Sequence, residues 1–119
     1  MSYVDGFVIP VPADNKEKYI AVAEQAAEMF MRHGATSVRE NWGVDVPPGE
    51  TTSFSAAVKL KDGEAVVFSW VEWPSKEERD KAMPALSEEM HASMPVEGMP
   101  FDGQRLIFGS FETIVHRQS

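Results

Sequence analysis

Hydrophobic residues recur along the chain with two different periods, and segments of one period alternate with segments of the other. Residues 3–9 and 65–73 place apolar side chains on both faces of an extended segment. A period of two is typical of β-strands, and apolar residues on both faces indicate strands that are covered on both sides. Residues 36–42, 53–60 and 105–115 are predicted to form further strands.

Two segments carry helical spacing instead. Apolar residues between positions 14 and 33 recur at intervals typical of an amphipathic helix, and Gly34 is expected to end it. A second helix is expected to begin after Ser75, which forms a capping box with Glu78. Pro84 is expected to kink or divide this second helix, because proline has no N–H to donate.

The order of these elements predicts the fold class. A tight hairpin is expected at Asp62-Gly63, between residues 53–60 and 65–73, because such turns need a positive φ. The resulting order, β-α-β-β-β-α-β, is typical of an α+β ferredoxin-like subunit, with an antiparallel sheet and helices on one face. The helices leave the second apolar face of residues 65–73 without cover. The sequence therefore predicts a homodimer joined through the helix-free sheet face.

Composition limits the classes of protein that fit. A chain of 119 residues is expected to form one domain, residues 1–119. The absence of cysteine excludes disulfides, thiolate nucleophiles and Cys-ligated zinc. No signal peptide and no apolar stretch of about 20 residues is found, so we expect a soluble cytoplasmic protein with no membrane partner. The net charge of -8 repels phosphate backbones and disfavours nucleic-acid binding.

Three carboxylates lie inside predicted strands and are candidates for acid–base chemistry: Asp5, Glu40 and Glu72. A carboxylate among apolar neighbours must be paired, hydrogen-bonded or neutral. A raised pKa would suit a general acid or base. The alternative is a purely structural explanation, either exposure at a sheet edge or an ion pair with an arginine such as Arg39 or Arg105.

Aromatic residues near the irregular loops suggest a ligand cavity between the helices and the sheet. Its candidate lining residues are Trp42, Trp70, Trp73, Phe101 and Arg105. Core packing or a dimer interface would use the same aromatic residues. No glycine-rich phosphate loop or nucleophile elbow occurs, and one Glu-His pair at helical spacing does not make a metal site. No cofactor and no metal is therefore expected.

The segment GMPFDGQRLIFGSFE, at residues 98–112, reads as a turn before the last strand. Because a turn needs no aromatic residue, Phe101 is expected to be a buried anchor. Asp102 is expected to accept hydrogen bonds from backbone N–H groups or from Arg79 or Arg105. Arg79 itself is expected to pair with Asp45 or Asp102, or to bind an anion.

Four stretches carry a resemblance to a known family: YVDGF from residue 3, NWGVDVPPG from residue 41, VVFSWVEWPSKEERD from residue 66 and MPFDGQRLIFGSF from residue 99. Together they resemble the YbaA-like family of uncharacterised bacterial proteins. The resemblance implies a ferredoxin-like subunit that pairs sheet to sheet into a dimeric α/β barrel, and it implies no established activity. The family often has Trp-Gly-Asp-Asp after the second strand, whereas this chain has Val44 before Asp45.

Three functions follow from these observations. The first is a homodimer that binds a small apolar or anionic molecule in a cavity between helices and sheet. The second is a cofactor-independent monooxygenase-like enzyme, because the fold is similar to that of dimeric α/β-barrel monooxygenases. The haem-degrading members of that fold use an Asn on the first strand, a Trp on the strand before the second helix and a His in that helix. This chain has Asp5 and no Asn on the first strand, and His91 lies far beyond Trp73, so it does not match that pattern. The third function, an RNA-binding module, is disfavoured by the charge.

Overall fold

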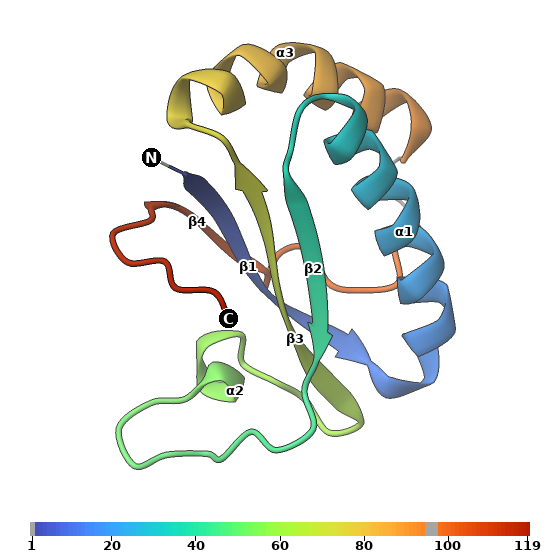
Figure 1. Ribbon diagram of the computed structural model, residues 1–119. Helices are drawn as coiled ribbons and strands as arrows, with labels where there is room; N and C mark the ends of the chain where they lie inside the picture. Colours follow the sequence, from blue (N-terminus) through green and yellow to red (C-terminus); the bar gives the residue numbers. More distant parts are fainter. Residues whose placement is uncertain (1, 95–97) are drawn as a thin grey trace.

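The computed structural model describes residues 2–94 and 98–119 (Figure 1). Four strands form one sheet, with two long helices and two short helical turns between them. The elements in chain order are β1 (Tyr3–Pro12), the 3-10 turn η1 (Ala13–Asn15), α1 (Lys16–Arg32), β2 (Ser37–Trp42), α2 (Phe54–Ala57), β3 (Glu64–Trp73), α3 (Lys76–Ser93) and β4 (Ile107–Glu112).

The sheet has the strand order β2-β3-β1-β4, and every neighbouring pair is antiparallel. With α1 and α3 as the connections, this arrangement confirms the predicted α+β ferredoxin-like class. The register aligns Asp5 with Val71 on β3 and with Ser110 on β4. Because side chains alternate along a strand, aligned residues lie on the same face of the sheet.

Both long helices cover the same face of the sheet. Tyr19 and Ala23 of α1 pack against Ile9 and Val67, in the core cluster nearer the start of that helix. A second cluster joins the other end of α1 to α3 through Met29, Val71, Trp73 and Leu86. The opposite face carries no long helix among the described elements (Figure 1). We call it the helix-free face.

The predicted strand at residues 53–60 and its hairpin are wrong. These residues contain α2, whose first turn is capped by the Ser53 hydroxyl accepting from the Ala56 N–H at 2.9 Å. The alternation of Phe54, Ala56 and Val58 suggested a strand, but both edges of β3 are already paired, one to β1 and one to β2. A further strand therefore has no free edge of β3 to pair with, and residues 53–60 form a loop that contains the short helix α2.

The ends of the other elements differ less from expectation. Gly34 has φ +111° and follows α1, as predicted for a residue that ends a helix. Around it the Ala35 N–H donates to the Phe30 carbonyl at 3.0 Å, closing a Schellman motif. Pro84 does not divide α3, which runs unbroken from Lys76 to Ser93. The last strand is shorter than predicted and ends at Glu112.

Candidate functional site

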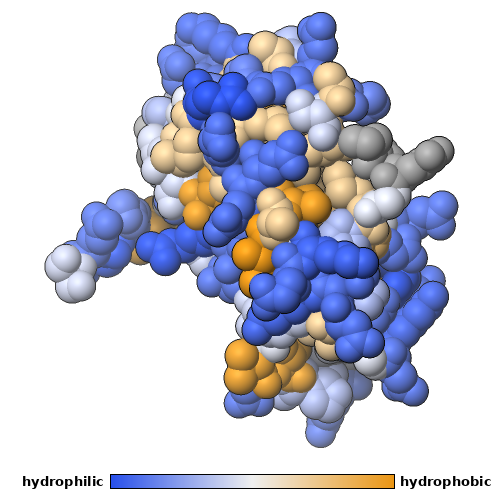
Figure 2. Space-filling model, turned by 90° about the vertical axis from the view of Figure 1, so that its right-hand side faces the viewer, coloured by the Kyte–Doolittle hydropathy of each residue, from blue (hydrophilic) through white to orange (hydrophobic). Residues whose placement is uncertain are grey.

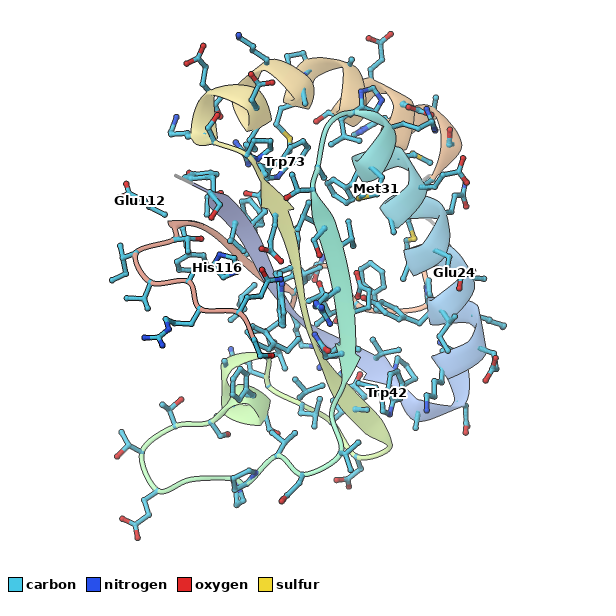
Figure 3. All side chains as sticks on the ribbon, viewed as in Figure 1. Glu24, Met31, Trp42, Trp73, Glu112 and His116 are labelled. Carbon is cyan, nitrogen blue, oxygen red and sulfur yellow. The ribbon has the colours of Figure 1, made fainter. Side chains whose placement is uncertain are left out.

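A groove of about 360 Å³ lies between α1 and the outer strand β2. The strand presents alternate residues to the helix, so Val38, Glu40 and Trp42 share the side that faces α1. Apolar residues of α1 form the opposite wall, among them Ile20 and Ala23. Figure 3 shows Trp42 at the end of β2, beside the beginning of α1.

Polar atoms in the groove converge on Glu40. The Tyr19 hydroxyl donates to Oε1 of Glu40 at 2.6 Å, and Tyr19 is only 5% exposed. Glu40 as a whole is an exposed residue of the edge strand β2, but its carboxylate turns toward Tyr19 and α1, and the partial loss of solvent there raises its pKa above the ordinary value. Hydrogen bonds from Tyr19 and Ser69 oppose that rise. Burial and the nearby Glu40 charge also raise the pKa of Tyr19, so the phenol remains a donor.

A cation lies at the Trp42 end of the groove. The Lys16 ammonium is 5.2 Å from the centroid of the Trp42 ring, within the range of a cation–π interaction. Viewed from the α1 side, hydrophobic surface shows between hydrophilic side chains (Figure 2). The groove therefore combines apolar walls with two carboxylates, Glu24 and Glu40, and one aromatic-bound cation.

Asp5 lies in the protein interior and belongs to a different cluster. It is 1% exposed and accepts from Trp73 Nε1 at 3.0 Å, Arg79 Nε at 3.1 Å and Ser110 Oγ at 2.6 Å. Arg79 also contacts Asp80 at 3.3 Å. The expected pairing of Arg79 with Asp45 or Asp102 is therefore wrong. The expectation failed because the register that brings Asp5 under the first turns of α3 is not visible in the sequence.

Arg105 connects the turn after α2 to the loop before β4. Its guanidinium donates to both carboxylate oxygens of Glu64, at 2.8 and 2.6 Å, and to the carbonyl of Lys59 at 3.0 Å. Arg105 Nε donates to Oδ2 of Asp102 at 2.9 Å, and the backbone N–H of Gln104 donates to Oδ1 at 2.9 Å. The hydrogen bonds expected of Asp102 are thus present. They tie two loops together, and they lie outside the groove.

The remaining candidates are dispersed over the molecule. Phe101 is partly buried behind the groove, where its ring meets Tyr19 edge-on at 5.9 Å. Trp73 is fully buried in the core. Trp70 and Glu72 lie on the helix-free face, where the indole N–H donates to the carboxylate at 3.3 Å. Asp45 is exposed in the loop after β2. Of the residues predicted from sequence, the groove contains Glu40 and Trp42.

The sequence interpretation missed Tyr19 and Lys16 as site residues. Tyr19 falls among the apolar residues of the first helix, and an aromatic residue at such a position normally packs in the core. Its spacing of three from Lys16 and four from Ala23 puts all three on one side of the helix. A hydroxyl on the stripe that faces the sheet was the available signal, because buried hydroxyls need a partner.

Residues 2–94 and 98–119 contain neither a cluster of metal ligands nor a helix that could span a membrane. No three His, Cys, Asp or Glu side chains in this part of the chain gather in a way that would hold a metal ion. None of the described helices is long and apolar enough to cross a membrane. The cytoplasmic location stays a prediction.

Comparisons with known proteins identify the family. The family model described as "Protein of unknown function (DUF1428)" matches residues 2–103. The uncharacterized protein YbaA of Escherichia coli strain K12 is 49% identical over 115 residues, covering 97% of this chain and 98% of that protein, and YbaA of Shigella flexneri matches equally. Among solved structures, a dimeric ferredoxin-like protein from an uncultured marine organism matches with a TM-score of 0.56 and 13% identity, over 100% of both chains. The chain belongs to the DUF1428 family, which includes the YbaA proteins.

Proposed function

We propose that this protein binds a small organic molecule in the groove between α1 and β2. One observation carries the proposal: the Glu40 carboxylate, bound by the buried Tyr19 hydroxyl, lines an open groove whose other walls are mostly apolar. Small-molecule sites are typically concave and apolar, with a few convergent polar groups. The volume of about 360 Å³ lies within the range of such sites.

A thermal-shift screen against metabolites tests this function, because a ligand that binds the folded state alone must raise its melting temperature. The Ala27→Phe variant places a ring in the groove, which Ala27 lines. We expect it to lose the response to any hit from the screen. Ala21→Phe is the matched control, since Ala21 is an exposed residue of the same helix that does not line the groove. A hit that survives Ala27→Phe unchanged contradicts binding in the groove.

The proposal includes a homodimer joined through the helix-free face. That face exposes Phe68, Ile107 and Phe111, from β3 and β4. The Phe111 ring lies across Gly6 and Gly109, at the distance where side chains at those positions would meet it. The loop with α2 covers only one end of the face, where Phe54 packs against Phe68 with ring centroids 5.5 Å apart. Dimerisation of the marine structural neighbour supports a second copy as the cover.

Light scattering tests the dimer. We expect twice the chain mass of 13.2 kDa at micromolar concentration. Phe111→Asp should dissociate the dimer, because a carboxylate would be buried without a partner. Val44→Asp is the control, because Val44 is 94% exposed in a loop. A wild-type chain that stays monomeric under these conditions rules out this part of the proposal.

A second candidate function is an enzyme of the cofactor-independent monooxygenase-like kind. The observation that favours catalysis is the raised pKa of Glu40 in an open groove, because a carboxylate with that property is suited to proton transfer. Oxygen uptake with a hydroquinone as substrate tests this candidate. Uptake that disappears in Glu40→Gln supports it, and the absence of any uptake above the rate without protein contradicts it.

A further inference from the structure

Two groups that line the groove, the Trp42 ring and the Glu40 carboxylate, are of the kinds that bind cations. Lys16 places its ammonium on the Trp42 ring at 5.2 Å. No Lys, Arg or His among residues 2–94 and 98–119 forms an ion pair with Glu40. The Glu40 carboxylate therefore has hydroxyl partners and no opposite charge beside it, and because Glu40 is an exposed residue its charge is open to a ligand from the groove.

We propose that the groove binds a small organic monocation, an amine or quaternary ammonium with a compact apolar body. The charged centre of the ligand would lie between the Glu40 carboxylate and the Trp42 ring. In the free protein the Lys16 ammonium occupies the position over that ring. This inference rests on the proposed function, because it names the class of ligand for the same groove.

Charge complementarity supports a cation over an anion. The ionisable groups that line the groove are Lys16, Tyr19 and Glu24 from α1 and Glu40 from β2. Once Lys16 leaves the Trp42 ring for solvent, both remaining charged groups are carboxylates. An anion would meet repulsion from both, whereas a cation would gain a charge-assisted hydrogen bond and a cation–π contact.

The release of Lys16 from the ring is expected to be easy. Lys16 is an exposed residue in the first turn of α1, and a helix N-terminus disfavours a positive charge. An exposed cation–π contact contributes little to stability. The apolar body of the ligand would replace water along Ile20, Ala23, Val38 and Val67, which line the groove around Glu40.

Three matched probes test the proposal: phenethylamine as the cation, 2-phenylethanol as the neutral analogue and phenylacetate as the anion. Binding is followed by NMR of the tryptophan indole N–H signals of the full-length protein. We expect phenethylamine to shift the Trp42 signal and to leave that of the fully buried Trp73 in place. The neutral and anionic probes should bind at least roughly tenfold more weakly than phenethylamine.

Two variants should move the affinity in opposite directions. Glu40→Gln removes the charge but keeps the shape, and should weaken phenethylamine binding roughly tenfold. Lys16→Met removes the competing cation and should strengthen binding several-fold. Lys18→Met is the matched control for Lys16, because Lys18 is an exposed residue of α1 that does not line the groove.

The failure of this inference is distinguishable from the failure of the proposed function. If 2-phenylethanol shifts the Trp42 signal at the same concentration as phenethylamine, the groove binds small molecules but the cation preference is wrong. If Lys16→Met and Lys18→Met leave the amine affinity equally unchanged, Lys16 does not compete with the ligand for the Trp42 ring, and the inference is overturned. If no probe shifts the Trp42 signal, the cation site is also overturned, and the metabolite screen decides the proposed function by itself.

Discussion

Asp5 and Glu40 are carboxylates on the same, helix-facing side of one sheet, yet their surroundings differ in kind. Asp5 is 1% exposed and accepts from an arginine, a tryptophan and a serine. Glu40 lies at the edge of the sheet, beside a groove, and the group that donates to it at 2.6 Å is the neutral hydroxyl of Tyr19. A buried carboxylate that has its counter-charge and its hydrogen bonds inside the protein is a structural group, whereas one that lacks a counter-charge beside an open groove is available to a ligand.

The largest difference between the two regions should appear in Asp5→Asn. The substitution removes the negative charge and leaves Arg79, which is 20% exposed, without its buried partner. Removing one partner of such a pair costs about 3 kcal/mol. Chemical denaturation should show this loss of stability, while ligand binding in the groove stays unchanged. A stability within about 0.5 kcal/mol of the wild type would mean that the ion pair is not formed in solution.

Trp73→Phe should have the second largest effect. It removes the indole N–H that donates to Asp5 at 3.0 Å, and it leaves space in a core position that is fully buried. Together these losses are expected to cost about 2 kcal/mol. Trp42→Phe, at the half-buried end of β2 and away from the proposed dimer face, is the comparison to measure alongside it by the same denaturation. Equal costs at both positions would contradict the structural role assigned to the Asp5 cluster.

Tyr19→Phe tests the other carboxylate and should cost about 1 kcal/mol, the usual contribution of one hydrogen bond. The informative measurement is the titration of Glu40 by carboxyl NMR. The Tyr19 hydrogen bond lowers the pKa of Glu40 against the effect of burial, so its removal should raise that pKa further. An unchanged pKa in Tyr19→Phe would show that the 2.6 Å hydrogen bond is absent in solution.

Glu40→Gln should have the smallest effect on stability, and an effect whose sign depends on pH. Folding raises the pKa of Glu40, so its contribution to stability is fully present below the pKa of the unfolded chain and is lost as the pH rises through the folded pKa. The melting temperature of Glu40→Gln should therefore rise relative to wild type as the pH rises from the ordinary value of 4.5 through the higher pKa that Glu40 has in the folded protein.

Glu64→Gln provides the opposite sign as a control. Hydrogen bonds from Arg105 lower the pKa of Glu64, so its contribution is present above the unfolded pKa and is lost as the pH falls through the folded one. The melting temperature of Glu64→Gln should therefore fall relative to wild type as the pH rises from below the folded pKa of Glu64 to the ordinary value of 4.5, a window below that of Glu40. Parallel pH profiles for the two variants would contradict the contrast between a paired and an unpaired carboxylate.

Both predicted long helices and four of the five predicted strands are present in the structure, because local periodicity decides those elements. The prediction failed at Phe54–Ala57, where an alternating pattern looked like a strand. The pattern could not show that β1 and β2 already occupy both edges of β3, which is a property of the whole sheet. Local signals are reliable where tertiary pairing agrees with them, and they mislead where it does not.

The site was predictable in part for the same reason. Glu40 stood out as a carboxylate inside a strand, and Trp42 as an aromatic residue beside a loop. Tyr19 and Lys16 did not stand out, because their role depends on the packing of α1 against β2. A local sequence pattern contains no information about that packing. The same limit applied to Arg79, whose partner Asp5 lies 74 positions away in the sequence.

The most direct test of the account is the NMR titration of the Glu40 carboxyl with and without phenethylamine. The account predicts that this carboxyl titrates above its ordinary value of 4.5 in the free protein, and that the bound amine lowers its pKa because a cation stabilises the charged form. A Glu40 pKa at or below 4.5 in the free protein, or one that does not fall when phenethylamine is bound, would contradict it.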